Sequence, residues 1–173
     1  MLKLYDHPLS GNCYKVRLAL NQLGAEYERE YLDIFKGEQH RGEYQSLNPN
    51  KKIPVLIDGN FHMWESNAIL LYLGKKFSPN RLYPEELETF GAMAQWLFFG
   101  KTSVDPSLAV ARYFTKFLSP AERDEKRLNE LRTQGNFVLR ILDSHLERQD
   151  FLAGIYTIAD IACYPYVNMA PEG

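Results

Sequence analysis

The stretch LKLYDHPLSGNCYKVRLAL, residues 2–20, decides the fold of the first part of the chain. In residues 2–5 the apolar Leu2 and Leu4 alternate with Lys3 and Tyr5, a pattern that predicts a short strand. Small and polar residues follow. From residue 12 to residue 23 the apolar positions recur at helical spacing, and Gly24 is placed to end the helix. The stretch therefore predicts a strand that leads through the loop LSGNC, residues 9–13, directly into a helix.

The elements that follow extend this pattern to residue 77. Alternation over residues 27–34 predicts a second strand, and a weak helical signal spans residues 42–47. Residues 55–57 and 61–64 flank Asp58-Gly59-Asn60, which predicts an antiparallel hairpin. Ser66 is expected to cap a helix that ends near Phe77. The order β-α-β-α-β-β-α with a mixed sheet is a thioredoxin-like α/β arrangement, which we assign to residues 1–77.

The remainder of the chain has a different character. Residues 78–85 contain two prolines and are typical of a linker. A helix follows around Met93, and Pro106 is expected to kink or interrupt it. Residues 122–147 carry apolar positions at near-helical spacing, and Thr157-Ile-Ala-Asp160 has the pattern of a capping box that opens another helix. These patterns predict an all-helical C-terminal domain over residues 86–173.

Composition narrows the classes of function. Of the 173 residues, 45% are hydrophobic and 24% are charged, as in an ordinary globular protein, and the net charge is −2. The scattered lysines and arginines do not form the basic footprint of a nucleic-acid or membrane-surface binder. No apolar run approaches the roughly 20 residues of a membrane span. Two cysteines are too few for a disulfide framework, so we expect a cytoplasmic protein.

Ser10 and Cys13 keep the spacing of the Cys-x-x-Cys motif that thioredoxin-type redox proteins place at such a junction, with serine at the first position. The start of a helix presents unpaired N–H groups and a partial positive charge, which favour a thiolate. Either a bound ligand supplies that thiolate and Ser10 donates its O–H to the sulfur, or Ser10 only caps the helix. Cys13 is best interpreted as a small buried helix residue.

Two further positions describe parts of a ligand site. Ile53-Pro54 stands immediately before a strand, where a cis bond would turn the backbone of Ile53 toward an extended peptide; an ordinary trans proline is the alternative. Glu65 and Ser66 stand at a helix start, which favours a carboxylate; simple capping is the alternative. A thiol at one helix start, an extended middle and an amino-acid head at the other together describe glutathione.

The sequence resembles the glutathione S-transferase superfamily, and is most similar to its theta-like and phi-like serine branches, including bacterial members. LYDHPLSGNCYKVRLAL is similar to the family's opening, with Ser10 at the catalytic serine. GEQHRGEYQSLNPNKKIPVLIDGNFHMWESNAILLYL resembles the family's glutathione site, and FLAGIYTIADIACYPYV resembles its C-terminal folding motif. The family normally continues past the last residue, Gly173, with further helices. We therefore expect a fragment or a naturally short protein.

The resemblance implies a role for each matching position. Ser10 would hydrogen-bond the glutathione sulfur, and Asn12 lies near enough to be a second donor. Ile53, before a cis Pro54, would pair with the cysteinyl backbone. The two charged ends of glutathione would be bound by four more residues: His40 and Lys52 at the glycyl carboxylate, Glu65 and Ser66 at the γ-glutamyl end. Without the resemblance, His40 and Lys52 are solvated surface side chains.

The second substrate is expected to lie against apolar side chains contributed by both domains. The candidate residues for this electrophile pocket are Leu9, Phe35, Trp96, Phe99 and Tyr113. An aromatic stripe at helical spacing is more often part of a helix core than of a pocket.

These observations predict a glutathione transferase that acts in detoxification. Glutathione would be its co-substrate, and no metal would take part. The enzyme would hold the thiol as thiolate for attack on a small hydrophobic electrophile. Two alternatives stay open: a glutathione-dependent disulfide reductase or peroxidase, and a non-enzymatic binding protein on the same fold. The resemblance also implies a homodimer, and the charge and hydropathy patterns predict no nucleic-acid or membrane partner.

Overall fold

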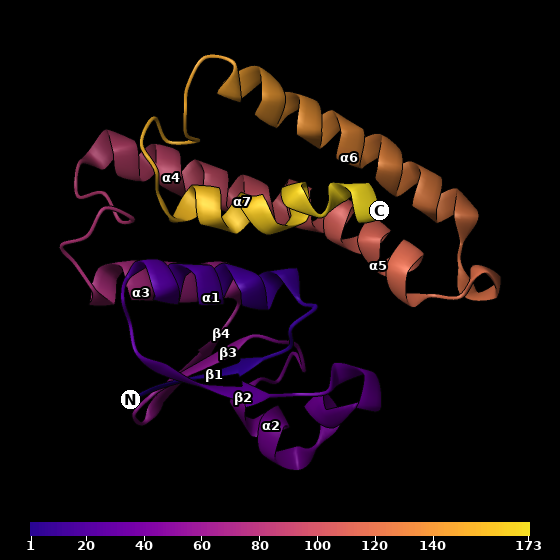
Figure 1. Cartoon of the computed structure of the whole chain (residues 1–173), viewed down its shortest axis with the longest axis horizontal. Coiled ribbons are helices and arrows are strands. Elements are labelled where there is room, and N and C mark those ends of the chain that lie inside the picture. The colour runs from indigo at the N-terminus through magenta and orange to yellow at the C-terminus, as the bar shows by residue number, and fades with distance from the viewer. The chain divides into compact units, whose positions relative to one another are not determined.

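The computed structural model describes residues 1–173 and contains two compact units, Met1–Tyr83 and Pro84–Gly173 (Figure 1). Each unit is built around its own set of buried apolar side chains, whose removal from water is the main favourable term in folding. No helix or strand lies between Lys76 and Leu87. None of the helices combines the length and the apolar character needed to cross a membrane.

The first unit contains a mixed four-stranded sheet in the order β2-β1-β3-β4. The central strand β1 (Leu2–Asp6) pairs in parallel with β2 (Tyr27–Tyr31) and antiparallel with β3 (Val55–Asp58). Strand β3 forms a hairpin with β4 (Phe61–Trp64), and Gly59 in its turn has a φ of 60°. The predicted thioredoxin-like arrangement is confirmed, including the parallel first pair and the antiparallel hairpin.

Helices cover both faces of this sheet (Figure 1). Helices α1 (Gly11–Gln22) and α3 (Ser66–Lys76) pack against each other on one face, and the short α2 (Gly42–Leu47) lies on the other. On the α2 side, Leu32, Tyr44 and Val55 form a buried cluster that also contacts Tyr5 and Ile53. Because Ile53 precedes β3, this cluster packs against the segment that leads into β3.

Two element boundaries in the first unit differ from the sequence prediction. Strand β2 ends at Tyr31 instead of residue 34, because the Asp33 carboxylate accepts from the backbone N–H groups of Phe35 and Lys36 and starts a 3-10 turn, η1 (Ile34–Lys36). Ser66 was expected to be the cap of α3, but Glu65 occupies the N-cap position and Ser66 is the first helical residue. The Ser66 hydroxyl is used elsewhere, as described below.

The second unit is helical, and its long first segment has an unusual middle. Helix α4 (Leu87–Phe99) continues into a π-helix, η3 (Gly100–Ala109), and then into α5 (Val110–Phe117). Pro106 was expected to kink or interrupt this helix; the chain stays helical through it, but the α-helical pattern gives way to the π-helical segment η3, in which Pro106 lies. A widened turn relieves the clash that a proline ring makes with the carbonyl four residues earlier, so the helix changes its hydrogen-bond pattern without ending.

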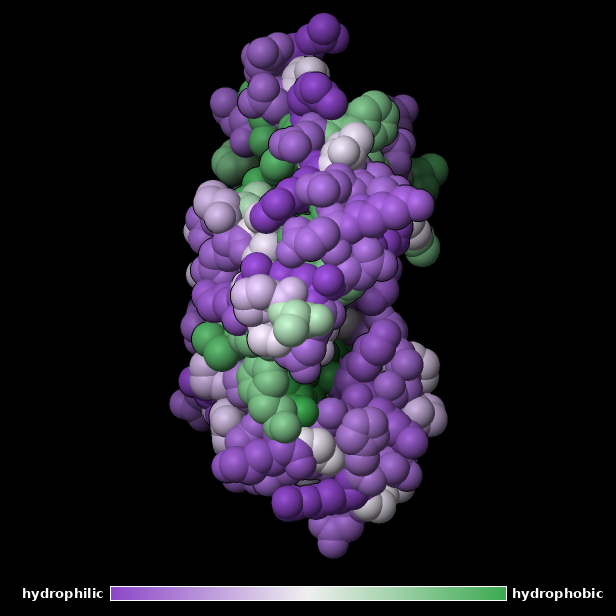
Figure 2. Space-filling model, turned by 90° about the vertical axis from the view of Figure 1, so that its right-hand side faces the viewer, coloured by the Kyte–Doolittle hydropathy of each residue, from purple (hydrophilic) through white to green (hydrophobic).

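Two further long helices complete the second unit. Helix α6 (Glu125–Leu146) starts later than expected, because Pro120–Glu122 forms a separate 3-10 turn and the Asp124 side chain caps α6 by accepting from Arg127 N. Helix α7 (Ile158–Asn168) packs against α4 and η3. The face of the molecule shown in Figure 2 is mainly hydrophilic, with small apolar areas between polar side chains.

The predicted capping box at the start of α7 is confirmed. Thr157 is completely buried, and its backbone N–H donates to the Asp160 carboxylate over 2.8 Å. The other oxygen of Asp160 accepts from Leu152 N at 2.9 Å, so one carboxylate satisfies the N–H groups of two loop residues. The cap therefore joins the start of α7 to the loop that precedes it.

Asp160→Ala is expected to lower the free energy of unfolding by about 2 kcal/mol, because two buried N–H donors lose their acceptor. Asp160→Asn keeps one acceptor oxygen and is expected to cost about half as much. Urea denaturation measures both. The exposed Asp150→Ala is the control, expected to cost less than about 0.5 kcal/mol. Equal stability of Asp160→Ala and the control would show that the cap does not stabilise α7.

Candidate functional site

Ser10 lies at the junction of β1 and α1, as the N-cap of the helix. Its backbone N–H donates to His7 O at 3.0 Å, and its Oγ accepts from Cys13 N at 3.2 Å. The capping interaction uses a lone pair of the hydroxyl, so the single hydroxyl hydrogen can turn either toward the neighbouring Cys13 sulfur or toward an anion in front of the helix. One side chain can therefore cap the helix and donate to an anion in front of it.

Asn12 and Ser66 connect the starts of two helices. The Ser66 hydroxyl, which is 3% exposed, donates to Asn12 Oδ1 over 3.1 Å. Because the amide oxygen is engaged, the Asn12 Nδ2 hydrogens point away from Ser66 and remain for another acceptor. The structure thus brings together two residues 54 positions apart in the sequence, one expected at the sulfur and one at the γ-glutamyl end.

Glu65 precedes α3 in a backbone conformation that non-glycine residues rarely adopt, with φ 71° and ψ 110°. Its carboxylate lies 3.5 Å from Asn50 Nδ2, at the edge of hydrogen-bond distance. Backbone strain of this kind persists only where surrounding structure enforces it, and it is concentrated at functional sites. The observation supports a ligand-binding role for the start of α3.

The segment before β3 is held by two buried polar side chains that sequence reasoning did not identify. Lys52 O accepts from Tyr44 Oη at 2.7 Å and from Asn48 Nδ2 at 2.6 Å. Tyr44 and Asn48 are 4% and 2% exposed, and burial raises the pKa of the Tyr44 phenol well above its usual range. These residues fix the backbone that leads into Ile53-Pro54, whose peptide bond is cis, as the resemblance implies. In the sequence, the only indication of this arrangement was the helix stop at Asn48-Pro49.

His40 and Lys52 are both exposed. His40 ends a short 3-10 turn, η2 (Glu38–His40), and its carbonyl accepts from Gln45 Nε2 at 2.7 Å. Neither side chain contacts Ser10, Asn12, Glu65 or Ser66 in the structure, so the geometry leaves their expected role at the glycyl carboxylate a prediction.

Cys13 is completely buried on the inner face of α1. Burial raises the pKa of its thiol to about 12, against smaller lowering effects of the hydrogen bonds from Ser10 and His7. Cys13 is therefore a neutral thiol at physiological pH and does not act as a nucleophile. This agrees with its interpretation as a buried helix residue.

The expected electrophile-pocket residues belong to both units. Leu9 and Phe35, in the first unit, are 44% and 55% exposed. In the second unit, Phe99 lines a cavity of about 610 Å³ between η3 and α6, and Tyr113 on α5 is 49% exposed. Trp96 is only 7% exposed and its ring packs on Phe99 and on His145, which favours a core role for it.

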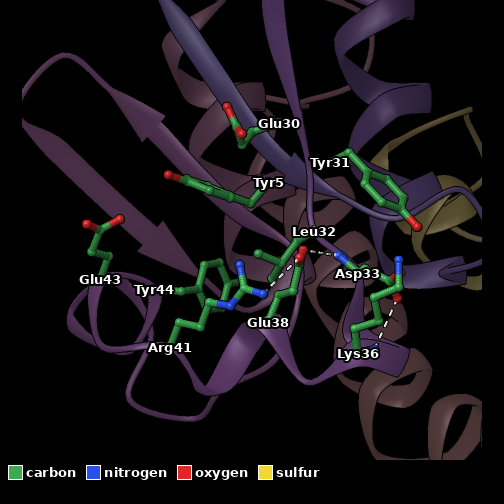
Figure 3. A pocket seen from close by; sticks show the side chains of 10 residues that line it. All are labelled: Tyr5, Glu30, Tyr31, Leu32, Asp33, Lys36, Glu38, Arg41, Glu43 and Tyr44. Carbon is green, nitrogen blue, oxygen red and sulfur yellow. Dashed lines mark hydrogen bonds and ion pairs between the residues drawn. The ribbon is translucent and has the colours of Figure 1, made fainter.

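A cavity of about 450 Å³ lies elsewhere in the first unit, beside β2 and between η1 and α2 (Figure 3). Its ion pairs join Lys36 to Asp33 and Arg41 to Glu38. None of the predicted glutathione-binding residues lines this cavity, and its four acidic side chains outnumber its two basic ones. The cavity is lined by Tyr5, Glu30, Tyr31, Leu32, Asp33, Lys36, Glu38, Arg41, Glu43 and Tyr44.

With this geometry in place, comparison with known proteins shows the family. Residues 1–75 match the family model described as the N-terminal domain of glutathione S-transferase, and residues 92–172 match the one described as its C-terminal domain. The chain belongs to the glutathione S-transferase family.

Three relatives illustrate the range of this similarity. A glutathione S-transferase structure from Pseudomonas fluorescens is 37% identical, with a TM-score of 0.90 over 99% of this chain and 85% of that one. A glutathione transferase from Burkholderia graminis, solved with two glutathione molecules bound per subunit, is 31% identical, with a TM-score of 0.90 over 98% of this chain and 72% of that one. The disulfide-bond oxidoreductase YfcG of Escherichia coli is 31% identical over 97% of this chain and 80% of its own length.

Proposed function

We propose that this protein binds glutathione, holds its thiol as thiolate at the start of α1, and adds it to a small hydrophobic electrophile. The observation that carries the proposal is the geometry of Ser10. Its Oγ caps the helix by accepting from Cys13 N, and its hydrogen remains to be donated to a sulfur in front of the free N–H groups. A hydrogen bond to the charged form of the thiol lowers its pKa.

The rest of glutathione is assigned to residues of the same unit. Ser66, with Glu65 beside it, begins α3, where a helix N-terminus favours the γ-glutamyl carboxylate while the Glu65 carboxylate pairs with the ammonium. The backbone of Ile53 binds the cysteinyl residue, next to the Lys52 carbonyl that Tyr44 and Asn48 hold in place. The exposed side chains of Lys52 and His40 are assigned to the glycyl carboxylate.

Asn12 is proposed as the second donor to the sulfur, because its Oδ1 is engaged by Ser66 and its Nδ2 is not. The exposed apolar side chains of Leu9 and Phe35 are proposed to contact the electrophile. We further propose a serine-type enzyme that works in the cytoplasm in detoxification, in line with the low cysteine content and the sequence resemblance.

A second candidate reaction is glutathione-dependent disulfide reduction, favoured by the similarity to the Escherichia coli oxidoreductase. Both cysteines of this chain are buried, so the thiols for such a reaction would come from two glutathione molecules, which leave as glutathione disulfide. Parallel assays with a chloronitrobenzene electrophile and with hydroxyethyl disulfide rank the two reactions. Faster turnover of the disulfide would displace transfer as the main activity.

Glutathione is expected to bind with micromolar to millimolar affinity in titration calorimetry. Glu65→Ala and Ser66→Ala should each weaken binding by about 1–3 kcal/mol, because a charged end of the ligand loses a partner. Ser46→Ala is the matched control, since the Ser46 hydroxyl bonds only to Glu43 O within α2. Folded protein that releases no heat at millimolar glutathione would refute the proposed binding.

Ser10→Ala is expected to retain glutathione binding and to lower the conjugation rate at neutral pH by roughly 10- to 100-fold, the value of a hydrogen bond to a charged sulfur. The deficit should shrink as the pH rises above the pKa of the free thiol, because thiolate then forms without help. A pH–rate profile of both proteins measures this. A deficit that stays constant with pH would argue against thiol activation by Ser10.

We also propose a two-fold homodimer, the commonest oligomer symmetry and the one that the resemblance implies. Strand β4 lies at the edge of the sheet with Phe61 and Trp64 half or one-third exposed, which suits a covered surface. Light scattering is expected to give twice the monomer mass, and Phe61→Asp should shift the protein toward the monomer. A monomer mass for the unmodified protein would exclude the dimer.

A further inference from the structure

A buried cluster of charges lies directly behind the loop that carries Ser10. Asp6, the last residue of β1, is 1% exposed, and each of its carboxylate oxygens accepts a hydrogen bond from an arginine. Oδ1 accepts from Arg17 Nη1 on α1, and Oδ2 accepts from Arg29 on β2, with Arg29 Nε at 2.8 Å. One negative and two positive charges thus tie together three consecutive elements.

Arg17 differs from Arg29 in what else it reaches. Its Nη1 lies 3.5 Å from His7 O and its Nη2 lies 3.4 Å from Pro8 O, both in the loop between β1 and α1. The Arg17 side chain is 15% exposed, whereas that of Arg29 is 50% exposed. Asp6 therefore holds a guanidinium whose remaining N–H groups face the carbonyls of the loop.

The loop itself is organised by polar contacts. His7 Nδ1 accepts from Leu9 N at 3.2 Å, and His7 O accepts from Ser10 N at 3.0 Å. Pro8 and Leu9 are exposed and offer little apolar packing. The carbonyl of His7 is thus shared by Ser10 N and Arg17, so a change in the position of Arg17 is transmitted to Ser10 through one oxygen atom.

We propose that Arg17 is a positioning residue for Ser10. Its guanidinium, oriented by Asp6, fixes the carbonyls of His7 and Pro8 and so sets where the Ser10 hydroxyl points. The inference rests on the proposed function, in which that hydroxyl donates to the glutathione sulfur. The planar guanidinium of arginine has N–H donors in fixed directions, so it can bind a carboxylate and two carbonyls at once. A lysine ammonium on a flexible side chain cannot do this in the same geometry.

The alternative is that Arg17 only joins β1 to α1 and stabilises the fold. A double-mutant cycle separates the two interpretations, because a residue that acts through Ser10 loses its influence once Ser10 is removed. The single and double variants needed are Arg17→Met, Ser10→Ala and their combination. Arg29→Met is the matched control, since it removes the same kind of partner from Asp6 without a contact to the loop.

Arg17→Met is expected to lower kcat/KM for conjugation about tenfold at neutral pH, corresponding to a pKa of the bound thiol raised by about one unit. The ultraviolet absorbance of the bound thiolate, followed across pH, measures this shift directly. In the Ser10→Ala background, Arg17→Met is expected to change kcat/KM less than about twofold. Arg29→Met should leave the thiol titration unchanged.

Equal fold-losses from Arg17→Met in the two backgrounds would overturn the inference while leaving the proposed role of Ser10 intact. If Ser10→Ala has no effect of its own, the proposed function fails and the inference fails with it. Arg17→Lys, checked by circular dichroism for folding, keeps the positive charge but not the planar guanidinium. It is expected to show a smaller loss of the same kind, and wild-type titration and kcat/KM in this variant would overturn the inference.

Discussion

The start of α1 is the constraint on which the proposed site depends. Unpaired N–H groups and a partial positive charge favour an anion there, whatever residue precedes the helix. Ser10 satisfies the Cys13 N–H with a lone pair and keeps its own hydrogen, so capping the helix and binding a sulfur are two roles of one hydroxyl. The two interpretations that the sequence left open at Ser10 are therefore compatible.

The start of α3 follows the same logic at the opposite end of the proposed ligand. Because Ser66 is not the N-cap residue of α3, its hydroxyl does not cap the helix and instead donates to Asn12 on α1. Two helix N-termini are thereby joined through a single hydrogen bond, one suited to a thiolate and one to a carboxylate. A peptide with both groups fits this pair better than either group alone, and this favours glutathione over a simple thiol.

Local patterns predicted most of the fold, and long-range contacts explain the failures. The Asp58-Gly59-Asn60 turn and the apolar alternation around it fixed the hairpin, and α2 began and ended at the expected residues. The end of β2 depended on the Asp33 turn, and the continuation of the helix through Pro106 depended on a π-helical pattern. Tyr44 and Asn48 could not be found as site residues, because their bonds to Lys52 O require the folded chain to bring α2 against the start of β3.

The contrast between Cys13 and a ligand thiol shows why a diffusible sulfur suits this scaffold. Cys13 faces the core, where burial raises the pKa of its thiol to about 12 in spite of hydrogen bonds that favour the thiolate. A sulfur in front of half-buried Ser10 meets the same helix terminus without that burial. Desolvation opposes the thiolate form of Cys13, whereas the helix N–H groups support a thiolate in front of Ser10. In the proposed function, one turn of helix separates the unreactive sulfur of Cys13 from the reactive sulfur of the ligand. Arg17, between Asp6 and the carbonyls of His7 and Pro8, is proposed to hold that turn in place.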